Sequence, residues 1–372
     1  MVASAAVPLV PDYAGRCVSN LVPSLLGPGG TAALPSWFPA PVHDADQVVL
    51  LVLDGLGWNH LRARPELAPT LSALTGEAIM TVAPSTTATA LTSIATGLAP
   101  GEHGIVGYRF STRGEVLNVL RWSTPTGDAR KRLVPREVQP VPAFMGSTVP
   151  VVTKAEFAGS GFSMAHLGGA RHVGYRATST MLVQVRHLLA AGETLIYAYY
   201  DGIDKVAHEY GFGPYLDAEL CAVDELTRLL LANLPARTAL LVTADHGQVQ
   251  VGDRLVALDA GVVPLVAGQS GEGRFRWLHA RPGAAAELLA AANGAHGGSA
   301  WVVSVDEVID EGWFGPRVTS AARGRLGDVA LVARDPISFD DPADSGPFPL
   351  VCRHGSLTDD EMLVPLLAGR AS

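Results

Sequence analysis

The chain has 372 residues, of which 48% are hydrophobic, and 27 Lys and Arg against 36 Asp and Glu give a formal net charge of −9. This length suits one large α/β domain with an insertion, or two domains, around a substantial core. Proteins that bind a nucleic-acid polymer usually present a basic face, so the acidic balance argues against that function. Small phosphate esters stay open as ligands, because bound metal ions supply positive charge locally.

Targeting and redox signals are sparse. The three cysteines, Cys17, Cys221 and Cys352, have no framework spacing, so we expect reduced, buried thiols. The N-terminal stretch MVASAAVPLVPDYAGR has no positively charged region before an apolar segment, which argues against a signal peptide. No uninterrupted apolar run reaches the roughly 18 residues of a transmembrane helix. We therefore expect a cytoplasmic protein without membrane contact.

Buried strands and helices alternate along the chain. Residues 47–53 (QVVLLVL) are typical of a strand buried on both faces of a parallel sheet, and Asp54 and Gly55 end it. Further strands are predicted at 78–82, 194–200 and 238–243, and helices at 66–75, 87–97 and 216–233. This alternation predicts an α/β fold with a central, mostly parallel sheet flanked by helices.

Residues 250–325 interrupt that pattern. They contain the predicted strands FRWLHARP and AWVVSV, the Ala-rich helix GAAAELLAAANG between them, and an acidic turn region, DEVIDEGWFG. This unit has no site motif of its own, so we expect an inserted α+β cap at 250–325 and a catalytic core at 1–249 and 326–372. The segment GDVALVARD (327–335) is predicted to return as a core strand, and 107–150 to form a loop or hairpin over the site.

Acidic residues and histidines follow the predicted strands. Asp54 ends the first run, Asp204 follows the strand at 194–200, and Asp245 and His246 follow the strand at 238–243. The carboxyl edge of an open α/β sheet is where such folds place ligands. His208 lies four residues after Asp204, so a helical turn puts both on one face, as a divalent metal site requires. Capping or turn roles fit each motif alone, but their joint occurrence predicts a metal site.

A cluster of hydroxyl residues precedes the predicted helix at 87–97. Hydroxyls at this position are usually N-caps. A hydroxyl against a metal ion would instead be a nucleophile, and the helix N-terminus would favour an anionic phosphoryl group. The residues themselves leave the choice open among Ser85, Thr86, Thr87 and Thr89.

Together these segments resemble the alkaline phosphatase superfamily, and most its nucleotide pyrophosphatase/phosphodiesterase branch. The resemblance runs from Asp54 to the late His354 in the family's order. Its most distinctive part is PSTTATALTSIATGLAPGEHGIVG (84–107). The other segments that carry it are VLDG at Asp54, the Asp204/His208 pair, ADHG at 244–247, and His354-Gly355.

The resemblance implies hydrolysis of a phosphodiester or nucleotide pyrophosphate bond through a phosphothreonine at Thr87. It also implies two divalent ions, with Zn²⁺ as the first choice and Mn²⁺ or Mg²⁺ as alternatives. The implied ligands are Asp204, His208 and His354 for one ion, and Asp54, Asp245, His246 and Thr87 for the other.

One position departs from the family pattern. Members of this branch carry an Asn after HGI that donates to a phosphate oxygen, where this chain has Gly107, Tyr108 and Arg109. We expect Tyr108, Arg109 or Asn118 to replace it. A phosphomonoesterase or phosphonate hydrolase with the same metal set stays open, as does a metal-binding protein without catalysis. The expected ligand is a small phosphate ester or nucleotide, and the aromatic candidates for stacking on it are Trp122, Phe144, Phe157 and Trp277.

Overall fold

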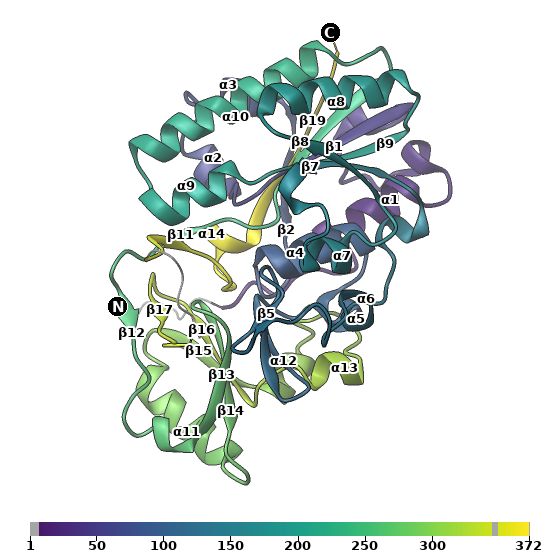
Figure 1. Cartoon of the computed structure of the whole chain (residues 1–372). Coiled ribbons are helices and arrows are strands. Elements are labelled where there is room, and N and C mark those ends of the chain that lie inside the picture. The colour runs from purple at the N-terminus through teal and green to yellow at the C-terminus, as the bar shows by residue number, and fades with distance from the viewer. Residues whose placement is uncertain (1–6, 344–348, 372) are drawn as a thin grey trace.

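The computed structural model describes residues 7–343 and 349–371, and a seven-stranded sheet forms its centre (Figure 1). Five neighbouring strands run parallel to one another. The C-terminal strand runs antiparallel to them and lies between this parallel group and the edge strand. The predicted mostly parallel sheet is confirmed. In spatial order the strands are β2 (Thr75–Met80), β19 (Leu363–Arg370), β10 (Thr238–Thr243), β1 (Gln47–Leu53), β9 (Leu195–Tyr200), β7 (Pro150–Lys154) and β8 (Arg171–Tyr175).

Helices cover both faces of this sheet, as predicted. The helices of this part of the chain are α1 (Leu21–Leu26), α2 (Trp58–Arg62), α3 (Pro69–Ala73), α4 (Thr87–Thr96), α5 (Pro100–His103), α6 (Pro135–Val138), α7 (Gly161–His166), α8 (Thr178–Ala190), α9 (Gly202–Tyr210), α10 (Pro214–Ala232) and α14 (Asp359–Met362). In Figure 1, α3, α8 and α10 lie on one side of the sheet, and α1 and α4 lie on the other.

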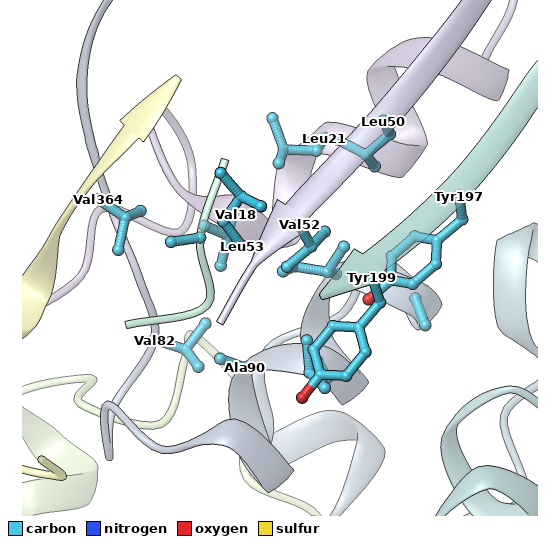
Figure 2. Packing of buried hydrophobic residues seen from close by; sticks show 14 of the residues in the cluster. Val18, Leu21, Leu50, Val52, Leu53, Val82, Ala90, Tyr197, Tyr199 and Val364 are labelled. Atoms are coloured by element: carbon cyan, nitrogen blue, oxygen red, sulfur yellow. The ribbon is translucent and has the colours of Figure 1, made fainter. Parts of the chain in front are cut away.

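Burial on both faces explains the continuous apolar runs of the central strands. All six residues of β10 are buried, and so are six of the seven residues of β1. Figure 2 shows Leu50 and Val52 of β1 in one cluster with Tyr197 and Tyr199 of β9 and Ala90 of α4. Val52 pairs in register with Tyr199 on one side and with Thr243 on the other, so the three strands end at the same edge.

A second, four-stranded antiparallel sheet lies beyond the first. Its strands in spatial order are β13 (Val266–Glu272), β14 (Phe275–Ala280), β16 (Val329–Ala333) and β15 (Ala300–Ser304), and its helices are α11 (Ala285–His296), α12 (Val305–Asp310) and α13 (Ser320–Arg323). The segment 327–335 is therefore not a core strand, because β16 pairs with β14 and β15. All five residues of β16 are buried, and a buried apolar run gives the same sequence pattern whichever sheet it joins.

The acidic region at 306–315 is not only a turn, because α12 occupies its first half. The Ser304 hydroxyl accepts from the Glu307 N–H at 3.2 Å, and the Glu307 carboxylate accepts from the Ser304 N–H at 2.7 Å. This reciprocal pair is a capping box, which starts a helix even in a short acidic segment.

The segment 107–150 contains the predicted hairpin within a small antiparallel sheet. Its strands are β3 (Arg109–Thr112), β4 (Glu115–Asn118), β5 (Ser123–Thr124) and β6 (Gly127–Asp128). Among the described residues there are also two short pairs of strands: β11 (Val249–Gln250) with β18 (Cys352–Arg353), and β12 (Leu255–Val256) with β17 (Ser338–Phe339). The first pair brings the segment of His354 next to the chain that follows His246.

Cys17 and Cys352 are buried free thiols as expected, whereas Cys221 is exposed. Among the helices of residues 7–343 and 349–371, none combines the length and the apolar character needed to cross a bilayer. The stretch that argued against a signal peptide starts in residues 1–6, which lie outside the described residues.

His103 makes stability depend on pH. Its Nδ1 accepts from the Ile105 N–H at 3.1 Å and its Nε2 lies 2.8 Å from the Ser93 hydroxyl, so the buried ring is neutral. Burial, and then Arg325, lower its pKa to about 3. In the unfolded chain this histidine takes up a proton near pH 6.5, whereas in the folded chain it does not. The unfolding free energy that the neutral ring contributes above pH 6.5 is therefore lost as the pH falls toward 3.

We predict that His103→Gln makes the protein less sensitive to acid. Between pH 7 and pH 5 the wild type should lose about 2 kcal/mol more unfolding free energy than the variant, from one histidine titrating in the unfolded state only. Urea unfolding followed by circular dichroism at both pH values measures the difference. Equal losses in the two proteins would contradict the assignment of a neutral, buried ring.

Candidate metal centre

Asp54 directly follows β1 and is 2% exposed. Its N–H donates to the Tyr200 carbonyl at 2.9 Å, and its carbonyl accepts from the Asp204 N–H at 3.1 Å, so β1 ends against the start of α9. Gly55 makes this approach feasible. It has a φ of 78°, and a Cβ there would lie 2.5 Å from the Gln248 amide nitrogen and 3.1 Å from the Asp204 Cα.

The carboxylates of Asp54 and Asp245 are each only half satisfied. The Tyr199 hydroxyl donates to Oδ2 of Asp54, and the N–H groups of Gly55 and His246 donate to Oδ1 of Asp245, each at 3.1 Å. The other two oxygens are buried without a hydrogen-bond partner among the described residues. They lie 3.3 and 3.4 Å from Nε2 of His246. Buried, unpartnered carboxylate oxygens of this kind are suited to a cation.

The three candidate histidines share one arrangement. Their Nδ1 atoms each lie against a backbone carbonyl, at 2.7 Å for His208, 3.0 Å for His246 and 2.9 Å for His354. A carbonyl only accepts, so Nδ1 carries the proton and Nε2 keeps its lone pair. Histidines that bind metal ions are usually oriented by such a contact.

The candidate ligand atoms form two groups, each with atoms within 4.8 Å of one another: Asp204, His208 and His354 in one, and Asp54, Asp204 and His246 in the other. Asp204 belongs to both. Its Oδ1 lies 3.2 Å from Nε2 of His208 and 3.7 Å from Nε2 of His354, and it accepts from the Gln248 amide at 2.9 Å. The His246 and His354 rings stack with centroids 3.6 Å apart, so the two groups adjoin.

Thr87 is the first residue of α4, and its Oγ1 lies 3.0 Å from Nε2 of His246. The Ser85 hydroxyl is instead held by the Ser356 carbonyl at 2.6 Å. Thr86 is the N-cap residue of α4. The Thr89 hydroxyl, which follows Ala88 in the first turn of this helix, is buried. The structure thus brings Thr87 to the candidate ligands, at the position that the family resemblance indicates.

Burial and like charge shift the titration of this centre. Burial, followed by Asp245 and Asp204, raises the pKa of Asp54 well above its usual range, and burial likewise raises the pKa of Asp245. Burial, followed by His246, lowers the pKa of His354 well below its usual range. A divalent cation would displace protons from the carboxylates, so cation binding is expected to weaken as the pH falls.

The predicted phosphate-binding residues separate in space. Tyr108 lines a cavity of about 310 Å³ beside Thr87 and His354, and its hydroxyl accepts from the Asn118 amide at 2.6 Å. Arg109 lies elsewhere, in a buried ion pair with Asp341 at 2.6 Å. Of the aromatic candidates, Phe157 lines a second cavity next to Thr87, whereas Trp122, Phe144 and Trp277 are in the core.

Two supporting residues were not predicted. Tyr199 and Gln248 hold Asp54 and Asp204, respectively. Their positions carry a weak signal, since Tyr199 is next to last in a strand that ends at the site and Gln248 closely follows Asp245 and His246.

A buried ion pair fixes the loop that carries His354. The Arg274 guanidinium donates to both carboxylate oxygens of Glu361 at 2.7 Å, and both side chains are fully buried. Glu361 also accepts from the Ser356 N–H at 3.0 Å and the Thr358 hydroxyl at 2.5 Å. The loop after His354 is therefore tied to the second sheet.

The model of the type I phosphodiesterase/nucleotide pyrophosphatase family matches residues 48–346, and the chain belongs to that family. This confirms the predicted branch of the alkaline phosphatase superfamily, and the chain is a hydrolase of a metal-dependent family. No curated protein sequence matches the chain.

Solved structures share the fold. Murine ectonucleotide pyrophosphatase/phosphodiesterase 5, in an inactive threonine-to-alanine form with AMP, has 16% identity and a TM-score of 0.62, over 87% of this chain and 88% of that chain. The human protein has 16% identity and a TM-score of 0.61, over 87% and 88%. Phosphonoacetate hydrolase from Sinorhizobium meliloti, with phosphonoformate, has 18% identity and a TM-score of 0.63, over 89% and 91%.

Because Asp204 borders both ligand groups, Asp204→Asn should weaken cation binding at both. We predict that the wild type retains two Zn²⁺ ions per chain after gel filtration and that the variant retains fewer than one, measured by plasma mass spectrometry. The exposed Asp253 offers a matched control, since Asp253→Asn should retain two. Two ions in Asp204→Asn would contradict the shared position.

We also predict that Glu361→Gln is strongly destabilising. It leaves the Arg274 charge buried with a neutral partner, and breaking a buried pair typically costs about 3–5 kcal/mol of unfolding free energy. Urea unfolding measures the loss, and Glu225→Gln, in an exposed pair with Arg228, should change stability by less than about 1 kcal/mol. Similar effects of the two substitutions would refute the structural role of the buried pair.

Proposed function

We propose that the chain hydrolyses phosphodiester or nucleotide pyrophosphate bonds, with Thr87 as the nucleophile. The observation that carries the proposal is the position of Thr87. It is the first residue of α4, and its Oγ1 lies 3.0 Å from Nε2 of His246. A hydroxyl is a weak nucleophile, and coordination to a metal ion is one recognised way to activate it, so a hydroxyl against a candidate metal ligand is placed for that role.

The proposed centre holds two divalent ions. One would be bound by Asp204, His208 and His354, and the other by Asp54, Asp245, His246 and Thr87. Nitrogen and oxygen ligands without sulfur fit Zn²⁺, with Mn²⁺ or Mg²⁺ as alternatives. When bound, the ions would lower the pKa of the Thr87 hydroxyl and neutralise charge on the phosphoryl oxygens.

The residues of the chain then account for each step. The Thr87 hydroxyl passes its proton through water to the departing oxygen, and the Thr87 oxygen bonds to phosphorus while the bond from phosphorus to that departing oxygen breaks. The free N–H groups of the first turn of α4 favour the anionic phosphoryl group at that place. A water oxygen then bonds to phosphorus as the phosphothreonine bond breaks, and one proton of that water passes to the Thr87 oxygen.

Two cavities meet at Thr87 and favour a diester over a monoester. The apolar cavity, of about 220 Å³, has Leu91, Phe157, Phe162 and Tyr199 in its wall. The polar cavity, of about 310 Å³, has Thr86, Tyr108, Arg121, Arg353 and His354 in its wall. A phosphodiester has two arms to place on either side of the attacked phosphorus, whereas a monoester has one. Phe157 is placed to contact an aromatic arm.

The similar structures support small phosphorus-containing ligands. The murine relative is described with AMP, which supports a nucleotide substrate. Phosphonoacetate hydrolase is described with phosphonoformate and with phosphonoacetate, and it supports phosphonate hydrolysis as a second candidate function.

We predict that Thr87→Ala lowers kcat/KM for bis-p-nitrophenyl phosphate by roughly 10³-fold or more, because the group that bonds to phosphorus is gone. Metal content should stay at two ions, since the Asp and His ligands remain. Thr87→Ser, which keeps a hydroxyl, should retain far more activity, and Thr178→Ala, on the exposed start of α8, should match the wild type. Near-full activity of Thr87→Ala would overturn the assignment.

The wild type should also hydrolyse bis-p-nitrophenyl phosphate faster than p-nitrophenyl phosphate. A preference of tenfold or more for the monoester would contradict the diester proposal.

A further inference from the structure

We propose that the Tyr199 hydroxyl restricts Asp54 to one metal-binding oxygen, and that this makes the adjoining cation position selective for a four-coordinate ion such as Zn²⁺ over Mn²⁺. The inference rests on the proposed function for the presence of a cation at that position. It adds a residue outside the ligand set that determines which cation the position holds.

The strand register brings Tyr199 to Asp54. Tyr199 of β9 pairs in register with Val52 of β1 (Figure 2), and Asp54 lies two residues beyond Val52. Side chains two residues apart in an extended chain point to the same side, so the Tyr199 ring and the Asp54 carboxylate meet at one face of the sheet edge. The Tyr199 hydroxyl donates to Oδ2 of Asp54. A phenol stays protonated at neutral pH, so this donor is always present.

Each carboxylate of this cation position keeps one oxygen for a metal ion. Oδ2 of Asp54 is occupied by the Tyr199 hydroxyl. Oδ1 of Asp245 is occupied by the N–H groups of Gly55 and His246. The other oxygen of each carboxylate is buried and has no hydrogen-bond partner among the described residues. Two carboxylates that each offer one oxygen, together with one imidazole and one hydroxyl, supply four donor atoms.

The spacing of these donor atoms fits a tetrahedron. Oδ1 of Asp54 lies 3.3 Å from Nε2 of His246, and Oδ2 of Asp245 lies 3.4 Å from it. The Thr87 Oγ1 lies 3.0 Å from the same nitrogen. A tetrahedral ion with bonds of about 2.0–2.1 Å holds its ligands about 3.3–3.4 Å apart, whereas an octahedral ion holds neighbouring ligands about 2.9–3.0 Å apart. Both carboxylate distances therefore match the geometry in which proteins usually bind Zn²⁺.

A second Asp54 oxygen would change that geometry. Asp204 also borders this position, but its Oδ1 lies 3.2 Å from Nε2 of His208 and accepts from the Gln248 amide, so it is engaged toward the other ion. Without the Tyr199 hydroxyl, Oδ2 of Asp54 would be free to bind the cation as well. A carboxylate that binds through both oxygens raises the coordination number, and a higher number suits the oxygen-binding ion Mn²⁺ better than Zn²⁺.

The test measures the affinity of metal-free protein for Zn²⁺ and for Mn²⁺ separately, by isothermal titration calorimetry without substrate. Tyr199→Phe keeps the ring and removes only the hydroxyl. We expect one of its two Zn²⁺ sites to weaken by about tenfold or more, because loss of a group that orients a metal ligand typically costs about 10–100-fold in affinity. The Mn²⁺ affinity of the same site should stay within about twofold of the wild type, or rise.

Co²⁺ in place of Zn²⁺ reports the coordination number, since four-coordinate Co²⁺ absorbs visible light far more strongly than six-coordinate Co²⁺. We expect the visible absorption of the Co²⁺-loaded wild type to weaken in Tyr199→Phe. Tyr200→Phe is the matched control, because successive side chains of a strand point to opposite faces and the Tyr200 hydroxyl donates to Glu219 at 2.7 Å. It should keep the wild-type affinities and spectrum.

Equal losses of Zn²⁺ and Mn²⁺ affinity in Tyr199→Phe would overturn the inference, because the hydroxyl would then only position Asp54. An unchanged Zn²⁺ affinity or an unchanged Co²⁺ spectrum would overturn it as well. These outcomes would leave the proposed function intact as long as the wild type binds two Zn²⁺ ions. Failure of the proposed hydrolysis would be seen separately, in the diester assay, since none of these measurements requires turnover.

Discussion

Three carboxylates, two of them buried, meet at one edge of the central sheet, and the rest of the site follows from the electrostatic cost of bringing them together. Asp54, Asp204 and Asp245 come from segments far apart in the chain. Asp54 and Asp245 are buried, the Asp204 side chain is 13% exposed, and burial together with the charges of Asp245 and Asp204 raises the pKa of Asp54. Each buried, uncompensated charge costs several kcal/mol. One tyrosine hydroxyl, one glutamine amide and a few backbone N–H groups satisfy part of this demand. Divalent cations would satisfy the remainder, and these same charges would then hold them.

The histidines show how the backbone prepares the centre. His208, His246 and His354 each turn Nε2 inward because a carbonyl holds Nδ1, and those carbonyls belong to Cys352, Gly247 and Ser85. The segment at Cys352 pairs with the strand after His246, and Ser85 forms a bridge with Gly355. The ring orientations therefore depend on correct docking of the late loop. The buried ion pair between Arg274 and Glu361 lies outside the site, but it fixes this loop and so affects the orientation of the rings.

Local sequence predicted the parts of the fold that local chemistry determines. β1 and β10 have the predicted bounds, because runs of six (48–53) and four (239–242) consecutive apolar residues, flanked by polar ones, admit few other structures. β16 has the same apolar character but belongs to the other sheet, since a buried run does not say which sheet buries it. β19, which contains Pro365 and Gly369, was not predicted, because its place in the sheet comes from neighbours far away in the chain.

The site shows the same division. The candidate ligands follow strands or share a helical face, so the sequence could bring them together. Arg109 looked like a phosphate ligand by its position after HGI, but the buried Asp341, 232 residues later, takes its guanidinium. The contribution of Tyr199 and the shared position of Asp204 depend on how strand ends meet in space, which no local pattern records.

The claim on which the account depends is that this edge holds two cations beside a threonine oxygen. Anomalous diffraction at the zinc absorption edge, from crystals grown with Zn²⁺, would locate them directly. The account predicts two peaks about 3.5–4 Å apart, one of them within bonding distance of Thr87 Oγ1. A single peak, or two peaks with Thr87 out of bonding distance of both, would contradict it.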